Sequence, residues 1–388
     1  MKKQLLFLSM AAVAALSSCS TDEAPETSVD VPVGMSEVPI RLSTGVQGTR
    51  ASIESDGNGL FEVDGLGIYA LARTVMQVNP APLPISWAGD APGTKTYGVL
   101  LENLEANAVK NEQGTLTNIE FADGQTYYYP MGNWYTYGFY GYYPRTEDIE
   151  ATATSRVANI TITGKEDVIY GKAVSDEAYA YSARYFRQEG NRDKVPAMQF
   201  EHKLMRLTFS AVPAPDIEGG SSYVSALNMK VMGVRVQGVP VEGKLVVADY
   251  TNPENDGKLT FNWDDTLAMR DLELLDANDQ PLNPDNYYME LSDSAPMEKV
   301  IGQGILLPVP EQGSGYTYKV AVTLADRDGN VYECEYPQQL ELSEGASFEA
   351  GKSYNVKLVV GMGLDTLSAA RQARSGAGIM DIVEARGQ

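Results

Sequence analysis

The sequence has 388 residues, enough for two domains of ordinary size, and carries 30 Lys and Arg against 52 Asp and Glu, a formal net charge of −22. Such an acidic surface repels phosphate backbones, so we do not expect nucleic-acid binding. Hydrophobic residues make up 43% of the chain, which also holds 23 tyrosines, so we expect a globular protein rather than a disordered one.

The N-terminus has the pattern of an export signal. Two lysines precede the uncharged run Leu5–Leu16, which is too short to cross about 30 Å of hydrocarbon as a permanent helix. The run ends in the tetrapeptide LSSC, which resembles the bacterial lipobox. We therefore predict a signal peptide over 1–18, a lipid on Cys19 that anchors the protein to a membrane, and a polar spacer over 19–35. The alternative is an ordinary secretory signal with a chance cysteine.

The segment 38–50 has the period of a β-strand with one buried face. The positions that we expect on the buried face are Val38, Ile40, Leu42, Thr44 and Val46. Pro39 has no amide hydrogen, which suits this strand to a sheet edge. The segment ends at Arg50 among small residues, where a trypsin-like protease could cut before Ala51. The alternative is a first strand followed by an ordinary loop.

Strand patterns continue along the rest of the chain. We predict strands at 65–73, 231–247, 316–324, 331–336 and 354–360. In the first of these, the apolar positions on one face are Leu66, Ile68, Ala70 and Ala72. The loop 325–330 is predicted to join two strands as a hairpin. Frequent Gly and Pro between short apolar runs indicate an all-β protein built of sandwiches. A proline-rich break at 212–216 divides it into predicted domains over 36–213 and 214–388.

Few residues offer chemistry. The one histidine, His202, lies inside a strand pattern, where a structural role is favoured over a catalytic one. Cys334 is left without an intrachain partner once Cys19 is lipidated, and it is expected to face the core. The acidic turn 326–330 resembles the start of a calcium loop, but Pro337 stands where the final glutamate is needed. We therefore predict no catalytic residues, no metal site, no cofactor and no enzymatic activity.

Four short motifs, in this order along the chain, resemble those of the fimbrillin family. They are the aromatic stretch 134–144 ending in Tyr-Tyr-Pro, the turn Asp167–Gly171, the run FEHKLMRLTF at 200–209 and Ala350–Tyr354. The resemblance implies two transthyretin-like β-sandwich domains in tandem and a structural subunit of a surface pilus. Asp22 and Glu23 also resemble the surface-export signal of lipoproteins in the bacteria that make fimbrillins, which implies the outer membrane.

The resemblance also implies a role for the first strand. Family members are cut by an arginine-specific protease at the end of this strand, and the matching bond here joins Arg50 to Ala51. The cut would free a groove that a strand from another fimbrial subunit then fills. The groove contacts are predicted to be Val38, Ile40, Leu42 and Val46. Burying these four side chains at about 1.5–3 kcal/mol each gives roughly 6–12 kcal/mol gross.

Two features leave the assignment open. Twenty-eight residues (361–388) follow the last predicted strand, and no clean donor strand is evident in them, so a tip or accessory subunit is an alternative to a stalk subunit. The aromatic run Tyr127–Tyr143 could instead form a sugar-stacking platform of a surface glycan-binding lipoprotein, although core packing is the usual fate of such runs.

Overall fold

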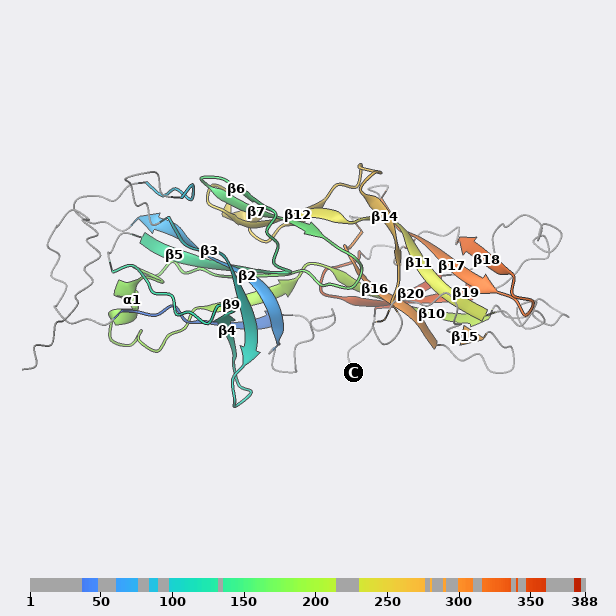
Figure 1. Cartoon of the computed structure of the whole chain (residues 1–388), viewed down its shortest axis with the longest axis horizontal. Helices are drawn as coiled ribbons and strands as arrows, with labels where there is room; N and C mark the ends of the chain where they lie inside the picture. The colour runs from blue at the N-terminus through green and yellow to red at the C-terminus, as the bar shows by residue number, and fades with distance from the viewer. Residues whose placement is uncertain are drawn as a thin grey trace, which may run out of the picture.

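The protein is an elongated molecule built almost entirely of β-strands (Figure 1). It is known from a computed structural model, which describes residues 37–47, 61–75, 84–89, 98–131, 135–213, 230–275, 280, 289–290, 299–309, 316–335, 340, 347–360 and 380–384. The all-β prediction is confirmed.

The first half holds ten strands and one short helix within the described residues. They are β1 (Leu42–Gln47), β2 (Val63–Val75), β3 (Val99–Lys110), β4 (Thr117–Phe121), β5 (Tyr135–Tyr143), β6 (Ile149–Ala151), β7 (Ser155–Thr161), β8 (Ile169–Ala173), α1 (Ala183–Arg187), β9 (Ala197–His202) and β10 (Met205–Pro213).

The second half continues the pattern with the remaining described strands and one 3-10 turn. They are β11 (Lys230–Pro240), β12 (Glu242–Asp249), η1 (Pro253–Asn255), β13 (Leu259–Phe261), β14 (Met269–Glu273), β15 (Met289–Glu290), β16 (Lys299–Leu306), β17 (Lys319–Ala325), β18 (Val331–Glu335), β19 (Ser353–Val360) and β20 (Met380–Glu384).

Seven strands of the first half form a closed sheet in the order β1-β4-β3-β2-β5-β8-β9. The pair β1–β9, which closes the sheet, is parallel, whereas the other neighbouring pairs are antiparallel. Closure gives each strand a neighbour on both sides, so no strand of this sheet is an open edge.

A second sheet joins the two halves of the chain. It has the order β13-β12-β7-β6, and Leu245 of β12 lies opposite Ala158 of β7. Lys172 of β8 also reaches across, its Nζ lying 3.0 Å from Oδ2 of Asp256. Strands from either side of the predicted boundary at 213/214 therefore share main-chain hydrogen bonds, and the division into two separate sandwiches stays a prediction.

Two further sheets consist mainly of strands from the second half, although β10 of the first half belongs to one of them. One has the order β16-β10-β19-β20, with β10 and β19 parallel and β20 at its edge. The other has the order β14-β11-β17-β18, with β15 paired to β11. The predicted hairpin at 325–330 is confirmed, since β17 and β18 flank it as antiparallel partners.

The core consists of two hydrophobic clusters that share β2. The predicted face of β2, residues 66, 68, 70 and 72, lies with Phe200 in the cluster that fills the closed sheet. Tyr69 and Leu71 of the opposite face belong to the other cluster, together with Leu245 and Val320 from the second half. Both faces of β2 are therefore buried, because the closed sheet is filled inside and covered outside.

Candidate functional site

The first strand, β1, is one of the strands of the closed sheet and lies between β4 and β9 (Figure 1). On one side, Leu42 lies opposite Ile119 of β4 in an antiparallel register. On the other side, Val46 lies opposite Phe200 of β9 in a parallel register. The strand that the sequence singles out is thus the element that completes this sheet.

The residues just before β1 are held on one side only. The amide of Ile40 donates to the carbonyl oxygen of Tyr127 at 2.8 Å, and the amide of Tyr129 donates to the carbonyl oxygen of Val38 at 3.0 Å. On the β9 side, the first bond runs from the amide of Ser43 to the carbonyl oxygen of Pro196, at 3.0 Å. Among the described residues, the stretch 38–41 therefore forms no hydrogen bond on the side that faces β9.

The predicted buried face of the first strand packs into the closed sheet. Ile40 is 5% exposed and Leu42 is 3% exposed, and both belong to the cluster that fills the sheet. Val38 is half-buried and packs against the same cluster. The side chain of Val46 lies outside the described part of the chain. That a partner strand would use these contacts remains a prediction.

The expected position of this strand at a sheet edge is wrong. Pro39 precedes β1 and forms an isolated bridge with Tyr128, whereas β1 itself is an interior strand. The proline is tolerated because its ring faces a hollow, at a place where no amide donor is required. The alternation of apolar residues correctly predicted the strand, but the inference from Pro39 that this strand lies at a sheet edge was wrong.

The predicted modification and cleavage residues lie outside the described residues. These are Cys19, Arg50 and Ala51. Strand β1 ends at Gln47, so the predicted cleavage bond follows the strand within a few residues of sequence. Lipidation and processing remain predictions.

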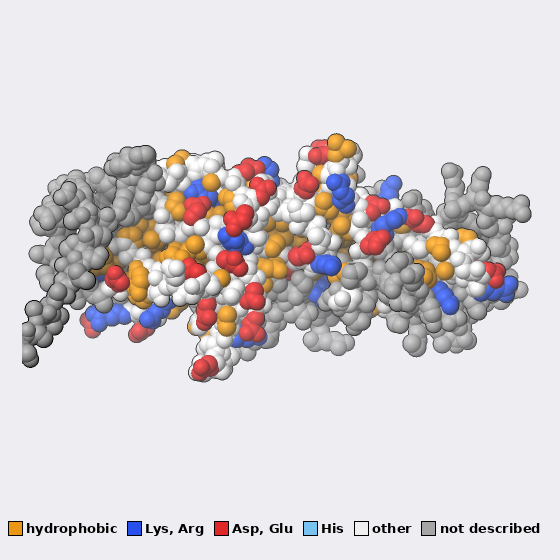
Figure 2. All heavy atoms as spheres, viewed as in Figure 1, with side chains coloured by type: hydrophobic (Ala, Val, Ile, Leu, Met, Phe, Trp, Pro, Cys, Tyr) orange, Lys and Arg blue, Asp and Glu red, His pale blue; other side chains and the backbone are white. Residues whose placement is uncertain are grey.

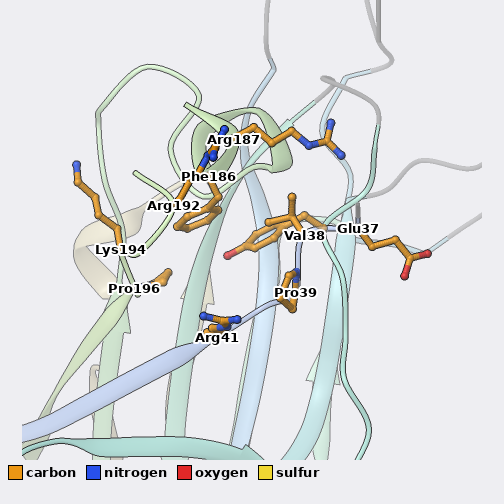
Figure 3. A pocket seen from close by; sticks show the side chains of 10 residues that line it. Glu37, Val38, Pro39, Arg41, Phe186, Arg187, Arg192, Lys194 and Pro196 are labelled. Carbon is orange, nitrogen blue, oxygen red and sulfur yellow. The ribbon is translucent and has the colours of Figure 1, made fainter. Parts of the chain in front are cut away.

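Two hollows flank the stretch 37–42. The first, of about 390 Å³, is lined by Arg41, Arg187, Arg192 and Lys194, and we name it the basic hollow (Figure 3). The second, of about 890 Å³, is lined by residues that include Leu42 and the 118–128 region. Figure 2 shows Lys and Arg side chains, with acidic side chains beside them, below the position that α1 occupies in Figure 1. The sequence did not single out any of these four basic side chains.

The C-terminal strand is placed differently from the first. Among the described strands, β20 pairs antiparallel with β19 and with no other, with Tyr354 opposite Glu384 and Leu358 opposite Met380. The sequence pattern did not identify this segment as a strand with a partner.

The histidine that could have served catalysis is a core residue. Nδ1 of His202 and Oδ2 of Asp167 are hydrogen-bonded at 2.6 Å, and both side chains are 0% exposed. The pair joins the end of β9 to the turn before β8, which agrees with the predicted structural role.

The aromatic run 127–143 is mostly core, as the sequence favoured. All residues of β5 from Tyr135 to Tyr142 are buried, and Tyr128 is the exposed tyrosine of the run within its described part. Trp134 lies outside the described residues. An exposed sugar-stacking platform along β5 is therefore excluded.

The acidic turn 326–330 is a plain hairpin turn. The Asp326 carboxylate accepts hydrogen bonds from the amides of Asp328 and Asn330, both at 2.9 Å, and from the hydroxyl of Tyr332. Its oxygens are thereby committed to the turn. The described part of the chain contains no group of three or more metal-ligating side chains.

Within the described residues, no helix has the length and apolar character that crossing a membrane requires.

The comparisons with known proteins point to one family. The fimbrillin-like family model matches residues 49–371, beginning just after β1. A search of curated proteins found no match. Similar solved structures include candidate cell adhesion proteins from Bacteroides uniformis (16% identity, TM-score 0.45, covering 90% of this chain and 97% of that one) and Parabacteroides distasonis (9%, 0.46, 90% and 97%). Another is the fimbrial anchor protein Mfa2 from Porphyromonas gingivalis (10%, 0.34, 89% and 97%). Since the family model covers most of the sequence, the chain belongs to the fimbrillin-like family.

Proposed function

We propose that this protein is a subunit of a cell-surface fimbria, exported as an outer-membrane lipoprotein through Cys19 and assembled by donor-strand exchange after cleavage between Arg50 and Ala51. The fimbrillin-like family consists of structural fimbrial and adhesin proteins, which supports a fimbrial role at the cell surface and association with other fimbrial subunits. The observation that carries the proposal is the interior position of β1 between β4 and β9.

Removing β1 would leave a slot with strong affinity for another strand. The slot would expose the main-chain groups of β4 and β9 that now pair with β1, together with the apolar surface that now covers Ile40 and Leu42. Burial of these two side chains alone is worth about 3–6 kcal/mol gross. Unpaired strand edges beside an apolar slot are the recognition surface that strand addition uses. The intact precursor would stay monomeric because its own strand fills the slot.

The described segment best placed to act as a donor is β20. It lies at a sheet edge and has β19 as its one neighbour among the described strands. Detaching β20 would break its hydrogen bonds to one neighbouring strand, whereas detaching β1 would break hydrogen bonds to two. The release of β20 therefore costs fewer main-chain hydrogen bonds than the release of β1. In this proposal β20 of one subunit fills the slot that β1 leaves in the next.

Limited digestion with an arginine-specific protease tests the assembly step. We expect the purified chain to be cut first after Arg50, and the products to form a ladder of SDS-resistant oligomers. The variant Arg50→Gln should remain uncut at this bond and monomeric. Arg327→Gln is the matched control, because it removes an exposed arginine from the β17–β18 turn and should behave like wild type.

The N-terminus of the form found on cells completes this test. Ala51 as first residue would indicate processing and assembly, whereas an acylated Cys19 would indicate a permanent anchor. Oligomers formed by Arg50→Gln, or a fully processed chain that stays monomeric, would overturn the proposed assembly.

A further inference from the structure

The basic hollow concentrates positive charge in an acidic protein. Its lining holds Arg41, Arg187, Arg192 and Lys194, and Glu37 is the acid among the described lining residues. The whole chain carries a net charge of −22. Since like charges gathered around one hollow repel one another, such a cluster is costly unless a negatively charged group enters it.

The arginines of the hollow are not neutralised by neighbouring acids. Arg41, Arg187 and Arg192 form no ion pair within the part of the chain that the structure describes. Lys194 lies 3.7 Å from Glu177, and its hydrogen bond with the hydroxyl of Tyr185 raises its pKa, so the ammonium stays charged. The hollow is therefore strongly cationic at neutral pH.

Two buried donors at the hollow lack acceptors. Tyr129 lines it and is 2% exposed, and its hydroxyl has no hydrogen-bond partner among the described residues. Burial raises the pKa of Tyr129 well above its usual value, so the hydroxyl keeps its proton and can donate. Nε of Arg187 is also buried without a partner, while its Nη2 contacts only the weakly accepting sulfur of Met131, at 2.7 Å. Both atoms are closed to solvent, so a ligand in the hollow reaches them only after neighbouring side chains move, whereas the outer nitrogens of the guanidinium groups carry the recognition.

The shape of the hollow favours a ligand larger than a single ion. Its volume, about 390 Å³, falls in the range of about 300–1,000 Å³ that is typical of small-molecule sites. Phe186, Pro39 and Pro196 give it apolar walls beside the cations (Figure 3). A sugar ring presents C–H groups to such walls and carries its anionic groups at the ring edge.

A peptide strand fits this hollow less well. The main-chain groups of Val38 and Ile40 are committed to the 127–129 side, and Pro39 offers no amide donor toward the hollow. Strand addition depends on main-chain pairing, and Pro39 removes one of the donors that this edge would need. Recognition at this place therefore relies more on side chains than on the main chain.

We propose that the basic hollow binds a saccharide carrying sulfate or carboxylate groups. The guanidinium groups of Arg187 and Arg192 pair with its anionic groups. Sulfated and uronic saccharides share this chemistry, and the experiment below separates them.

The site is divided between the first segment and the body of the protein. Val38, Pro39 and Arg41 come from the segment that ends in β1, whereas Phe186, Arg187 and Arg192 come from α1 and the loop after it. A ligand that contacts both parts binds the strand-in state more tightly than the strand-out state. It follows, if the proposed function holds, that bound saccharide retains β1 in the closed sheet and slows assembly.

Isothermal titration calorimetry of the intact full-length chain tests the site. The probes are a heparin-derived hexasaccharide, an oligogalacturonate of equal length, an uncharged maltohexaose and a hexaglutamate peptide. We expect binding of at least one anionic saccharide, weakened by added salt, and no binding of maltohexaose. Binding of the peptide as tight as that of the saccharides, or no binding of either saccharide, overturns the proposal.

Variants localise the binding. Arg187→Gln with Arg192→Gln should lower affinity by about tenfold or more. The control Arg270→Gln with Lys319→Gln removes the same charge from exposed positions of the second half and should leave affinity unchanged. Equal loss in the control double variant would show a non-specific charge effect and would overturn the assignment to this hollow.

The assembly consequence is measured separately. After cleavage at Arg50, oligomer formation should slow several-fold in saturating saccharide, and this effect should vanish in the Arg187→Gln, Arg192→Gln variant. Because the calorimetry uses uncleaved protein, a failure of strand exchange leaves the binding result intact, and a failure of binding leaves strand exchange intact.

Discussion

The first and last described strands of this protein are held in contrasting ways. Strand β1 has β4 on one side and β9 on the other, and it completes a closed sheet. Strand β20 has β19 on one side and ends its sheet. The residues before β1 add two further main-chain bonds to the 127–129 segment and bury Ile40.

This contrast shows why a cut in the chain is a sensible trigger for assembly. A strand bonded on both sides and packed into a core leaves slowly by thermal opening, whereas an edge strand opens locally at a lower free energy. An intact precursor would therefore keep its slot filled even while β20 detaches and returns. Cleavage at Arg50 would make the departure of β1 irreversible, because the strand would no longer be tethered to the domain that it leaves.

The largest expected effect comes from placing a charge in the closed sheet. Ile40→Asp should lower the free energy of unfolding by about 3–5 kcal/mol, because an isolated carboxylate is buried where an apolar side chain now packs. Urea denaturation, followed by tyrosine and tryptophan fluorescence, measures the change.

A matched substitution on an exposed strand sharpens this test. Val331→Asp in β18 introduces the same charge at a position that is 65% exposed, and should change stability by no more than about 0.5 kcal/mol. Equal midpoints for Ile40→Asp and wild type would mean that the first segment does not contribute to the folded core.

The sequence was most informative where a strand has one clear period. Alternation in β2 and in the first segment correctly placed Leu66, Ile68, Ile40 and Leu42 in the cluster that fills the closed sheet, because the face on which a side chain lies follows from its position along the strand. Alternation did not show that the opposite face of β2 is buried as well. The partners of these strands could not be predicted in the same way. The parallel pairing of β1 with β9 joins residues about 150 positions apart, and no local pattern encodes it.

A second comparison of the two strands concerns their opening. We expect the amides of β20 to exchange with deuterium at an opening free energy at least roughly 2 kcal/mol below that of the β1 amides, since β20 has one ladder and β1 has two. Hydrogen exchange with peptide-level mass spectrometry on the uncleaved chain measures both. Protection of β20 equal to that of β1 would remove it as the donor candidate.

The basic hollow illustrates what the sequence could not reveal. Its cations come from positions 41, 187, 192 and 194, so the cluster exists only after β1 is placed beside α1 and the loop that follows it. One local signal was present, since the segment 184–194 is rich in arginine and lysine within an acidic chain. The lack of acceptors for Tyr129 and Arg187 is a property of packing and has no counterpart in the sequence.

The smallest expected effect tests the seam between β1 and β9. Thr44 is 4% exposed, and its Oγ1 donates to the carbonyl oxygen of Met198 in β9 at 2.9 Å. Thr44→Val keeps the size and branching of the side chain but removes this donor. The buried carbonyl oxygen of Met198 then loses this hydrogen bond. We expect a loss of about 1 kcal/mol in the free energy of unfolding.

The control for this substitution lies in the same closed sheet. Thr74 of β2 is exposed, so Thr74→Val should change stability by less than about 0.5 kcal/mol in the same denaturation experiment. If the two valine variants lose equal stability, the hydrogen bond to Met198 contributes nothing and the seam is held by main-chain pairing and apolar burial alone. If Thr44→Val alone is destabilised, the side chain adds to the retention of β1, and the same variant should then release its first strand faster than wild type once Arg50 is cut, because a weaker seam lowers the barrier to departure.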